Sequence, residues 1–292
     1  MSTDDAKRKE NTKGVLLAIA AALASITIYH LIGKVISGMI SDEFVSTLLS
    51  ELVFTILAFI SVMLLKQKDL FHSDPALFKS GWKSAGLLIF IIVAFGVMGL
   101  AQLFDVKITP VQWALFIVQV LLVGVAEEIL FRGLIQRAFH RFFGEDSMAN
   151  VYKAIVCSGI IFGLVHLVNM DRGNPMLASV LQAGVNCFAG IYYGAVFFRT
   201  GKNIKYLIIL HALYDYVGMV FNGRLKGESI NSILSPGGGP PTLRAAAAGI
   251  LVWGGIYLLS TIFILRPSKV KPLLTNTEED KSVIENIEID GA

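Results

Sequence analysis

The chain has 292 residues, of which 54% are hydrophobic and 16% are charged, and its mean hydropathy is +0.66. Too few charged side chains remain to cover a water-exposed surface, so this composition excludes a soluble globular protein and indicates a polytopic membrane protein in a lipid bilayer. The formal net charge of +3 is small, and the basic residues lie in short connections between apolar segments, so we expect no nucleic-acid partner.

The chain begins with a polar segment of mixed charge, residues 1–13. The apolar run that follows, 14–32, contains the sequence Ala-Leu-Ala at 22–24, which resembles a signal-peptide cleavage site. Because the run continues to about twenty residues, which is long enough to span a bilayer, we interpret it as a retained first transmembrane helix.

Eight apolar segments of roughly 18–25 residues can cross the membrane. They are 14–32, 44–65, 85–104, 111–136, 151–168, 177–198, 204–221 and 243–265. The fourth qualifies only if Glu127, Glu128 and Arg132 are tolerated, and the seventh only if His211 and Asp215 are. The sequence therefore predicts an all-α, polytopic membrane bundle of about eight transmembrane helices.

The distribution of lysine and arginine predicts the orientation. Basic residues are concentrated in the N-terminal segment and in the connections 66–83, 137–153, 199–205 and 266–271, whereas the alternate connections hold fewer. The positive-inside rule then places both termini in the cytoplasm, which requires an even number of spans. We expect a multi-pass protein of the plasma membrane of a bacterium.

Two of the predicted spans carry ionisable residues at helical spacing. Glu128 and Arg132 are four residues apart, so they share a helix face and can neutralise one another. Glu127 is rotated by about 100° from Glu128 and can face another group. His211 and Asp215 are also four apart, which suits a carboxylate that orients an imidazole.

The fifth span carries His166, and Phe162, four residues earlier, can pack under its ring. Glycines at 159 and 163 in this span, and at 190 and 194 in the next, form small-xxx-small patterns that let two helix backbones approach closely in lipid. His166 lies seven residues after the first glycine and therefore on the close-packed face.

Each of these polar residues has a purely structural interpretation: an ion pair that holds a helix, or a core histidine with a satisfied hydrogen bond. Taken together they favour a shared function, because each charge near a bilayer centre costs roughly 2.5–3.5 kcal/mol on insertion scales. One carboxylate held by arginine, a second carboxylate that faces another direction and two imidazoles form a combination that fits the activation of a water molecule.

The motifs at 127–132 (Glu-Glu-x-x-x-Arg), 162–166 (Phe-x-x-x-His) and 211–215 (His-x-x-x-Asp) resemble the three motifs of the CPBP family. This family includes the type II CAAX prenyl endopeptidases and the bacterial Abi, or bacteriocin self-immunity, proteins. The resemblance covers about residues 110–222. It implies an intramembrane endopeptidase with a membrane or membrane-proximal protein substrate, in protein processing or bacteriocin self-immunity.

The resemblance also implies roles for single residues. Glu127 with His166 would activate the attacking water, and Glu128 with Arg132 would brace the site. Members have been described both as metalloproteases and as glutamate-dependent enzymes without metal. A divalent metal such as zinc, if used, would be held by Glu127, His166 and His211.

His211 and the residue at position 215 would stabilise the tetrahedral oxyanion, and here the chain departs from the prenyl endopeptidases, which carry asparagine. An amide can donate a hydrogen bond to an oxyanion, whereas an ionised carboxylate cannot. Asp215 could donate if it were protonated, orient His211 instead, or ligate a metal.

The resemblance divides the chain into four expected parts. They are a cytoplasmic segment at 1–13, three accessory transmembrane helices at 14–109, a protease-like core at 110–266 and a disordered acidic cytoplasmic tail at 267–292. Two other functions stay open, a non-catalytic membrane scaffold or immunity protein and a proton-coupled transporter. The lack of paired half-helix breaks and inverted repeats counts against the transporter.

Overall fold

The structure is a computed structural model that describes the whole chain except residues 1–2, 68, 104–107, 173–175, 222–241 and 275–292. Most of the predicted acidic tail, 275–292, therefore lies outside the described residues. The first part of that tail is described and helical, as α12 (Pro267–Val270) and η5 (Lys271–Leu273). Val270 is fully buried, and Arg199 Nη1 donates to the Lys269 carbonyl at 2.5 Å, so these two contacts fix the start of the predicted tail to the bundle.

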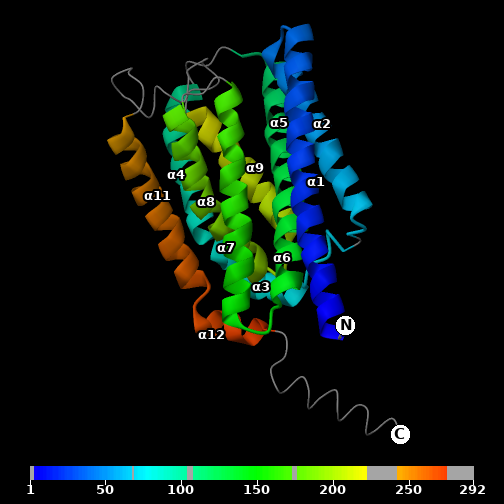
Figure 1. Cartoon of the computed structure of the whole chain (residues 1–292). Helices are drawn as coiled ribbons and strands as arrows, with labels where there is room; N and C mark the ends of the chain where they lie inside the picture. The colour runs from blue at the N-terminus through cyan, green and yellow to red at the C-terminus, as the bar shows by residue number, and fades with distance from the viewer. Residues whose placement is uncertain (1–2, 68, 104–107, 173–175, 222–241, 275–292) are drawn as a thin grey trace, which may run out of the picture.

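Long helices lie side by side and form a bundle (Figure 1). They are α1 (Thr3–Met39), α2 (Glu43–Leu64), α4 (Gly86–Leu103), α5 (Pro110–Glu128), α7 (Met148–Val165), α8 (Met176–Arg199), α9 (Ile204–Phe221) and α11 (Leu243–Ile264). Short helices connect them at α3 (Pro75–Gly81), η1 (Trp82–Ala85), α6 (Arg137–Phe143) and η3 (His166–Arg172).

Among the described residues, seven helical stretches are long and apolar enough to cross a membrane. They are Asp5–Met39, Glu43–Leu64, Pro75–Leu100, Pro110–Phe143, Met148–Val168, Met176–Arg199 and Ala246–Ile264. The helix α9 lies beside them in the bundle (Figure 1) and was predicted as the remaining span. The prediction of an all-α, multi-pass bundle of about eight helices is confirmed.

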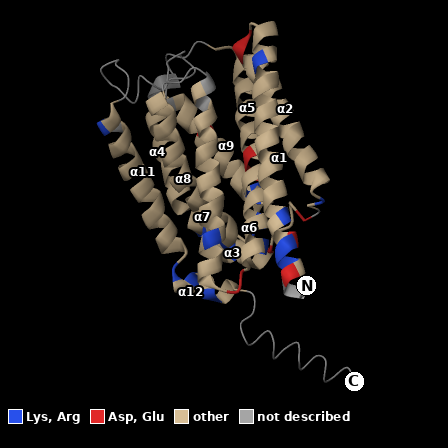
Figure 2. Ribbon diagram, in the orientation of Figure 1, with Lys and Arg blue, Asp and Glu red and all other residues tan. Residues whose placement is uncertain are grey.

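The surface of the bundle has the polarity that a bilayer requires. Large apolar side chains are exposed along its outer helices, for example Phe90 of α4 and both Leu251 and Phe263 of α11. Lysine and arginine gather mainly at the end of the bundle where the start of α1 and α12 lie (Figure 2). The assignment of this basic end to the cytoplasm stays a prediction.

The continuous helical segment that starts with α5 has a capping box at its N-terminus and a π-helix in its middle. Thr109 and Gln112 form a capping box, in which the Gln112 backbone donates to Thr109 Oγ1 at 3.2 Å and the Thr109 backbone donates to Gln112 Oε1 at 2.8 Å. After Glu128 the chain continues without a break into a π-helix, η2 (Ile129–Gln136), and then into α6. All eight residues of η2 are buried. Segments of π-helix within α-helices occur frequently at functional sites.

Glycines allow α7 and α8 to pack backbone to backbone, as predicted. A Cβ atom at Gly159 would lie 2.5 Å from the Ile191 backbone nitrogen, and one at Gly163 would lie 2.4 Å from that of Cys187. Any larger residue would force the helices apart. This contact fixes the C-terminal end of α7, where His166 follows.

Candidate active site

The ionisable residues predicted from the three motifs come from separate elements and lie in one buried region. Glu127 and Glu128 end α5, and Arg132 lies in η2; His166 is the residue that caps α7; His211 and Asp215 lie in the middle of α9. A further element, α8, contributes Tyr193, which is not one of the residues predicted from the sequence.

Glu128 is the most deeply buried acid of this region, with a fully buried side chain. Its Oε1 atom lies 2.7 Å from His211 Nδ1 and 3.3 Å from Arg132 Nη1. The predicted pairing of Glu128 with Arg132 is therefore present, and the same carboxylate also orients the imidazole. The spacing of His211 and Asp215 predicts Asp215 as one candidate for that orienting role.

Arg132 is held by two further elements. Its Nη2 atom donates to the Gly190 carbonyl of α8 at 3.3 Å. Its guanidinium carbon lies 4.4 Å from the ring centroid of Phe162 and 5.2 Å from that of Tyr193. Contacts with two aromatic faces stabilise a buried cation, so Arg132 connects α7 and α8 to the end of α5.

His211 presents its second nitrogen to two more carboxylates. Nε2 lies 3.6 Å from Glu127 Oε2 and 3.6 Å from Asp215 Oδ2. At these separations both carboxylates lie within ion-pair distance of Nε2 but slightly beyond a normal hydrogen bond. The side chains of Glu127 and Asp215 are 18% and 19% exposed, whereas Glu128 is fully buried. The site thus has a closed side at Nδ1 and an accessible side at Nε2.

His166 adds a second imidazole with a fixed tautomer. Its Nδ1 atom lies 2.8 Å from the Phe162 carbonyl oxygen, which can only accept, so Nδ1 donates and Nε2 carries the free lone pair of a neutral ring. The Phe162 ring contacts the His166 ring edge-on at 5.0 Å and the His211 ring at 6.2 Å. The predicted packing of Phe162 against His166 is confirmed. The pairing of Glu127 with His166 stays a prediction.

Tyr193 completes the enclosure of His211. Its ring stacks on the imidazole with centroids 5.3 Å apart and an interplanar angle of 21°. One signal in the sequence points to it, because Tyr193 follows Gly190 by three residues and precedes Gly194 by one, next to the small residues that mark the close-packed face.

The residues only partly fit a metal centre. Both histidines have Nδ1 engaged in a hydrogen bond, as metal-ligating histidines do, and so could offer Nε2. Within the part of the chain that the structure describes, however, no group of three or more His, Cys, Asp or Glu side chains is placed to hold a metal ion. Ligation of a metal by Glu127, His166 and His211 stays a prediction, and we derive no step through a metal.

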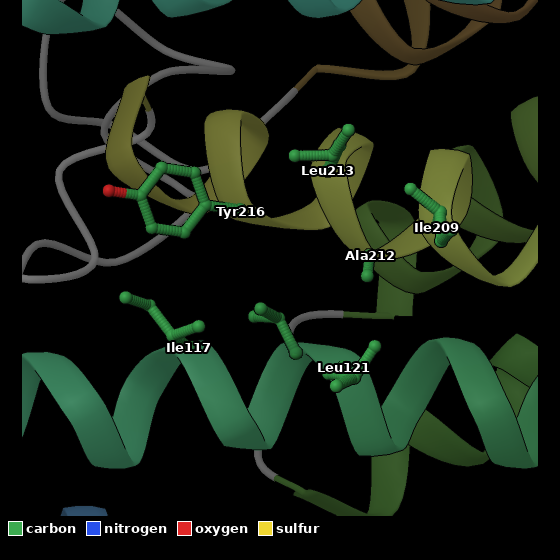
Figure 3. Close-up of a pocket in the computed structure, with 7 residues that line it drawn as sticks. Ile117, Leu121, Ile209, Ala212, Leu213 and Tyr216 are labelled. Carbon is green, nitrogen blue, oxygen red and sulfur yellow. The ribbon is translucent and has the colours of Figure 1, made fainter.

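An apolar groove of about 310 Å³ lies between α5 and α9 (Figure 3). It is lined by Ile117, Val120, Leu121, Ile209, Ala212, Leu213 and Tyr216. Ala212 and Tyr216 directly follow His211 and Asp215 in the chain, so the groove and the site lie along the same segment of α9, on different faces of that helix. Leu121 is among several lining residues that are exposed on the apolar surface of the bundle.

Comparison with protein families gives one match. Residues 109–217 match the family described as type II CAAX prenyl endopeptidase Rce1-like. The matched segment runs from the N-cap of α5 into α9, and it contains all three motifs. Neither the curated proteins nor the solved structures give a match to the chain.

Proposed function

We propose that this chain, whose residues 109–217 form a domain of the Rce1-like type II CAAX prenyl endopeptidase (CPBP) family, is an intramembrane endopeptidase. Membership of a membrane protease family implies a protein substrate. The observation that carries the proposal is the convergence of Glu127, Glu128 and Asp215 on the His211 imidazole, inside the matched segment.

In the proposed reaction Glu127 acts as the general base. Its carboxylate is partly exposed and lies on the accessible side of His211, so it can take a proton from a water molecule. The water oxygen then bonds to the carbonyl carbon of the substrate, and the carbonyl π electrons move to the oxygen. The proton held by Glu127 passes to the amide nitrogen, the electrons of the oxyanion re-form the C=O bond as the C–N bond breaks, and a carboxylic acid and an amine leave; transfer of the acid proton to the amine gives the carboxylate and the ammonium group.

The two histidines have different parts in this reaction. His211 is held through Nδ1 by Glu128 and, when protonated at Nε2, donates to the developing oxyanion. His166 offers the lone pair of Nε2 to the attacking water beside Glu127. Arg132 fixes the carboxylate of Glu128 and so keeps His211 in place.

The groove beside the site supports a substrate with an apolar segment. Its lining and its position on the lipid-facing surface suit a peptide chain that enters from the membrane or from the membrane surface (Figure 3). This agrees with a role in the processing of membrane or membrane-proximal proteins or in bacteriocin self-immunity.

The proposal is tested by comparing membrane proteomes of cells that carry the wild type or Glu127→Ala. We expect precursors to accumulate and their cleaved products to disappear in the variant, while the amount of protein inserted in the membrane is unchanged. Equal product formation by both would contradict the proposal. A phenotype that survives both Glu127→Gln and His166→Ala would favour the scaffold function instead.

Metal dependence is a separate question for the same preparation. If a divalent metal such as zinc takes part, thorough chelation should abolish hydrolysis, and readdition of the metal should restore it. If metal analysis finds no bound metal and hydrolysis persists, the metal-dependent reaction is ruled out and the glutamate-dependent reaction is favoured.

A further inference from the structure

The site is rich in hydrogen-bond acceptors and poor in donors. When ionised, the carboxylates of Glu127, Glu128 and Asp215 only accept. Arg132 is ion-paired with Glu128 and donates from Nη2 to the Gly190 carbonyl; its Nε and Nη1 make no hydrogen bond among the described residues, and they belong to the charged group that holds Glu128 on the closed side of His211. A tetrahedral oxyanion needs preorganised donors, and it would be repelled by the carboxylates that surround it.

The histidines supply few donors for this purpose. His166 donates through Nδ1 to the Phe162 carbonyl, and His211 donates through Nδ1 to Glu128. That leaves His211 Nε2, which is already flanked by two carboxylates at 3.6 Å. A second donor, neutral and not committed to another group, would complete the site.

The Tyr193 hydroxyl has these properties. The residue is 3% exposed, and its hydroxyl oxygen is buried without a hydrogen-bond partner among the described residues. Two neighbouring tyrosines, unlike Tyr193, have paired hydroxyls, because the Tyr257 hydroxyl donates to the Tyr214 hydroxyl at 3.3 Å. Buried tyrosine hydroxyls usually find a partner, so an unpaired one beside His211 indicates a partner that arrives with the substrate.

Packing holds the ring of Tyr193 in place beside His211. One face of the Tyr193 ring stacks on His211, the Arg132 guanidinium lies 5.2 Å from its centroid, and the Tyr214 ring meets it edge-on at 6.5 Å. A donor held in this way needs little reorganisation when charge develops, which is the condition for strong stabilisation of a transition state.

We propose that Tyr193 is a further catalytic residue, whose hydroxyl donates a hydrogen bond to the oxyanion of the tetrahedral intermediate. This inference rests on the proposed endopeptidase activity. The proton stays on the tyrosine oxygen throughout, so the balance of the hydrolysis is unchanged. Tyr193 supplies the neutral donor that an ionised Asp215 cannot supply, and Asp215 is then free to hold the His211 imidazolium.

The test compares Tyr193→Phe with Tyr192→Phe, two adjacent buried positions on α8. Tyr193→Phe keeps the ring that stacks on His211 and removes only the hydroxyl. The Tyr192 hydroxyl instead donates to the Ser84 carbonyl at 2.9 Å, away from the site. The probe is a mixture of internally quenched fluorescent peptides with randomised central residues and apolar flanks, hydrolysed by the purified full chain in liposomes.

We expect Tyr193→Phe to lower kcat about 10²-fold with KM unchanged, as for the loss of one oxyanion donor. Tyr192→Phe should retain the wild-type kcat. Equal kcat in Tyr193→Phe and the wild type, or a change confined to KM, would overturn the role of the hydroxyl and leave the endopeptidase proposal intact. No hydrolysis by the wild type would overturn both.

Binding of a peptidyl phosphinate, whose anionic tetrahedral group mimics the intermediate, gives an independent measurement that needs no turnover. Tyr193→Phe should weaken phosphinate binding more than binding of the matching uncleaved peptide, and Tyr192→Phe should change neither. Equal weakening of both ligands by Tyr193→Phe would show a general packing defect and overturn the assignment.

Discussion

Two regions of the bundle bury a glutamate inside a membrane helix, and they do so in different ways. Between α1 and α2, Glu51 is 5% exposed and accepts a hydrogen bond from the Tyr29 hydroxyl, whose ring stacks on Phe54 at 4.6 Å. In the core, Glu128 is fully buried and bonded to both His211 and Arg132, while Glu127 lies nearby.

The difference shows that burial of an acid in a membrane helix is by itself a weak sign of function. Glu51 lies outside the segment that matches the protease family, and its tyrosine partner satisfies the acid and joins two helices. The core instead brings three carboxylates around one imidazole and leaves two of them partly exposed. Convergence of ionisable groups from several helices, with access to them, marks the functional region.

The largest difference between the two regions should appear in catalysis. Glu127→Gln removes the proposed base and keeps its shape, so we expect kcat to fall about 10³-fold. Glu51→Gln changes a buried acid of the accessory region and should leave kcat unchanged. Hydrolysis of the quenched peptide mixture in liposomes measures kcat for both variants. Similar losses of kcat would contradict the assignment of catalysis to the core and not to the region between α1 and α2.

The second difference concerns the free energy of unfolding. Arg132→Met leaves the buried Glu128 carboxylate without its cation, which costs about 3–5 kcal/mol. Tyr29→Phe removes one hydrogen bond to Glu51, for which we expect about 1.5–3 kcal/mol. Denaturant unfolding of the purified protein in micelles gives both free energies. A smaller loss for Arg132→Met than for Tyr29→Phe would show that burial of Glu128 does not require the ion pair with Arg132.

A smaller contrast is expected at glycines. A Cβ at Gly163 would lie 2.4 Å from the Cys187 backbone nitrogen, so Gly163→Ala should destabilise the protein by about 1–3 kcal/mol. At Gly255 in α11 a Cβ would meet nothing within 4 Å, and Gly255→Ala should be neutral or stabilising by up to about 1 kcal/mol. Thermal unfolding in micelles ranks the stabilities of the two variants. Equal melting temperatures would mean that α7 and α8 can move apart without a loss in the free energy of unfolding.

Much of the fold follows from the sequence because hydrophobic length and helical spacing are local properties. They predicted the helix bundle, the pair of Glu128 with Arg132 and the packing of Phe162 on His166. The boundaries were less accurate. The first helix begins at Thr3, within the segment predicted as separate, since charged residues continue a helix outside the bilayer as readily as apolar ones.

The contacts between helices could not be predicted in the same way. The hydrogen bond from His211 to Glu128 joins residues 83 positions apart, and helical spacing carries no information about such a pair. The π-helix η2 differs from an α-helix in its backbone hydrogen-bond register, which the spacing of apolar residues does not reveal. Tyr193 was not predicted because its only signal is its position between Gly190 and Gly194, and Glu51 was not predicted because no second ionisable residue lies at helical spacing from it within the span 44–65.

The central claim is that the cluster around His211 hydrolyses peptide bonds with Glu127 as the base. The most direct measurement incubates purified wild type or Glu127→Gln with membranes from cells that lack the protein and identifies new peptide termini by mass spectrometry. We expect a set of new peptide termini that forms with the wild type and is absent with Glu127→Gln. The same termini with both proteins, or none with either, would contradict it.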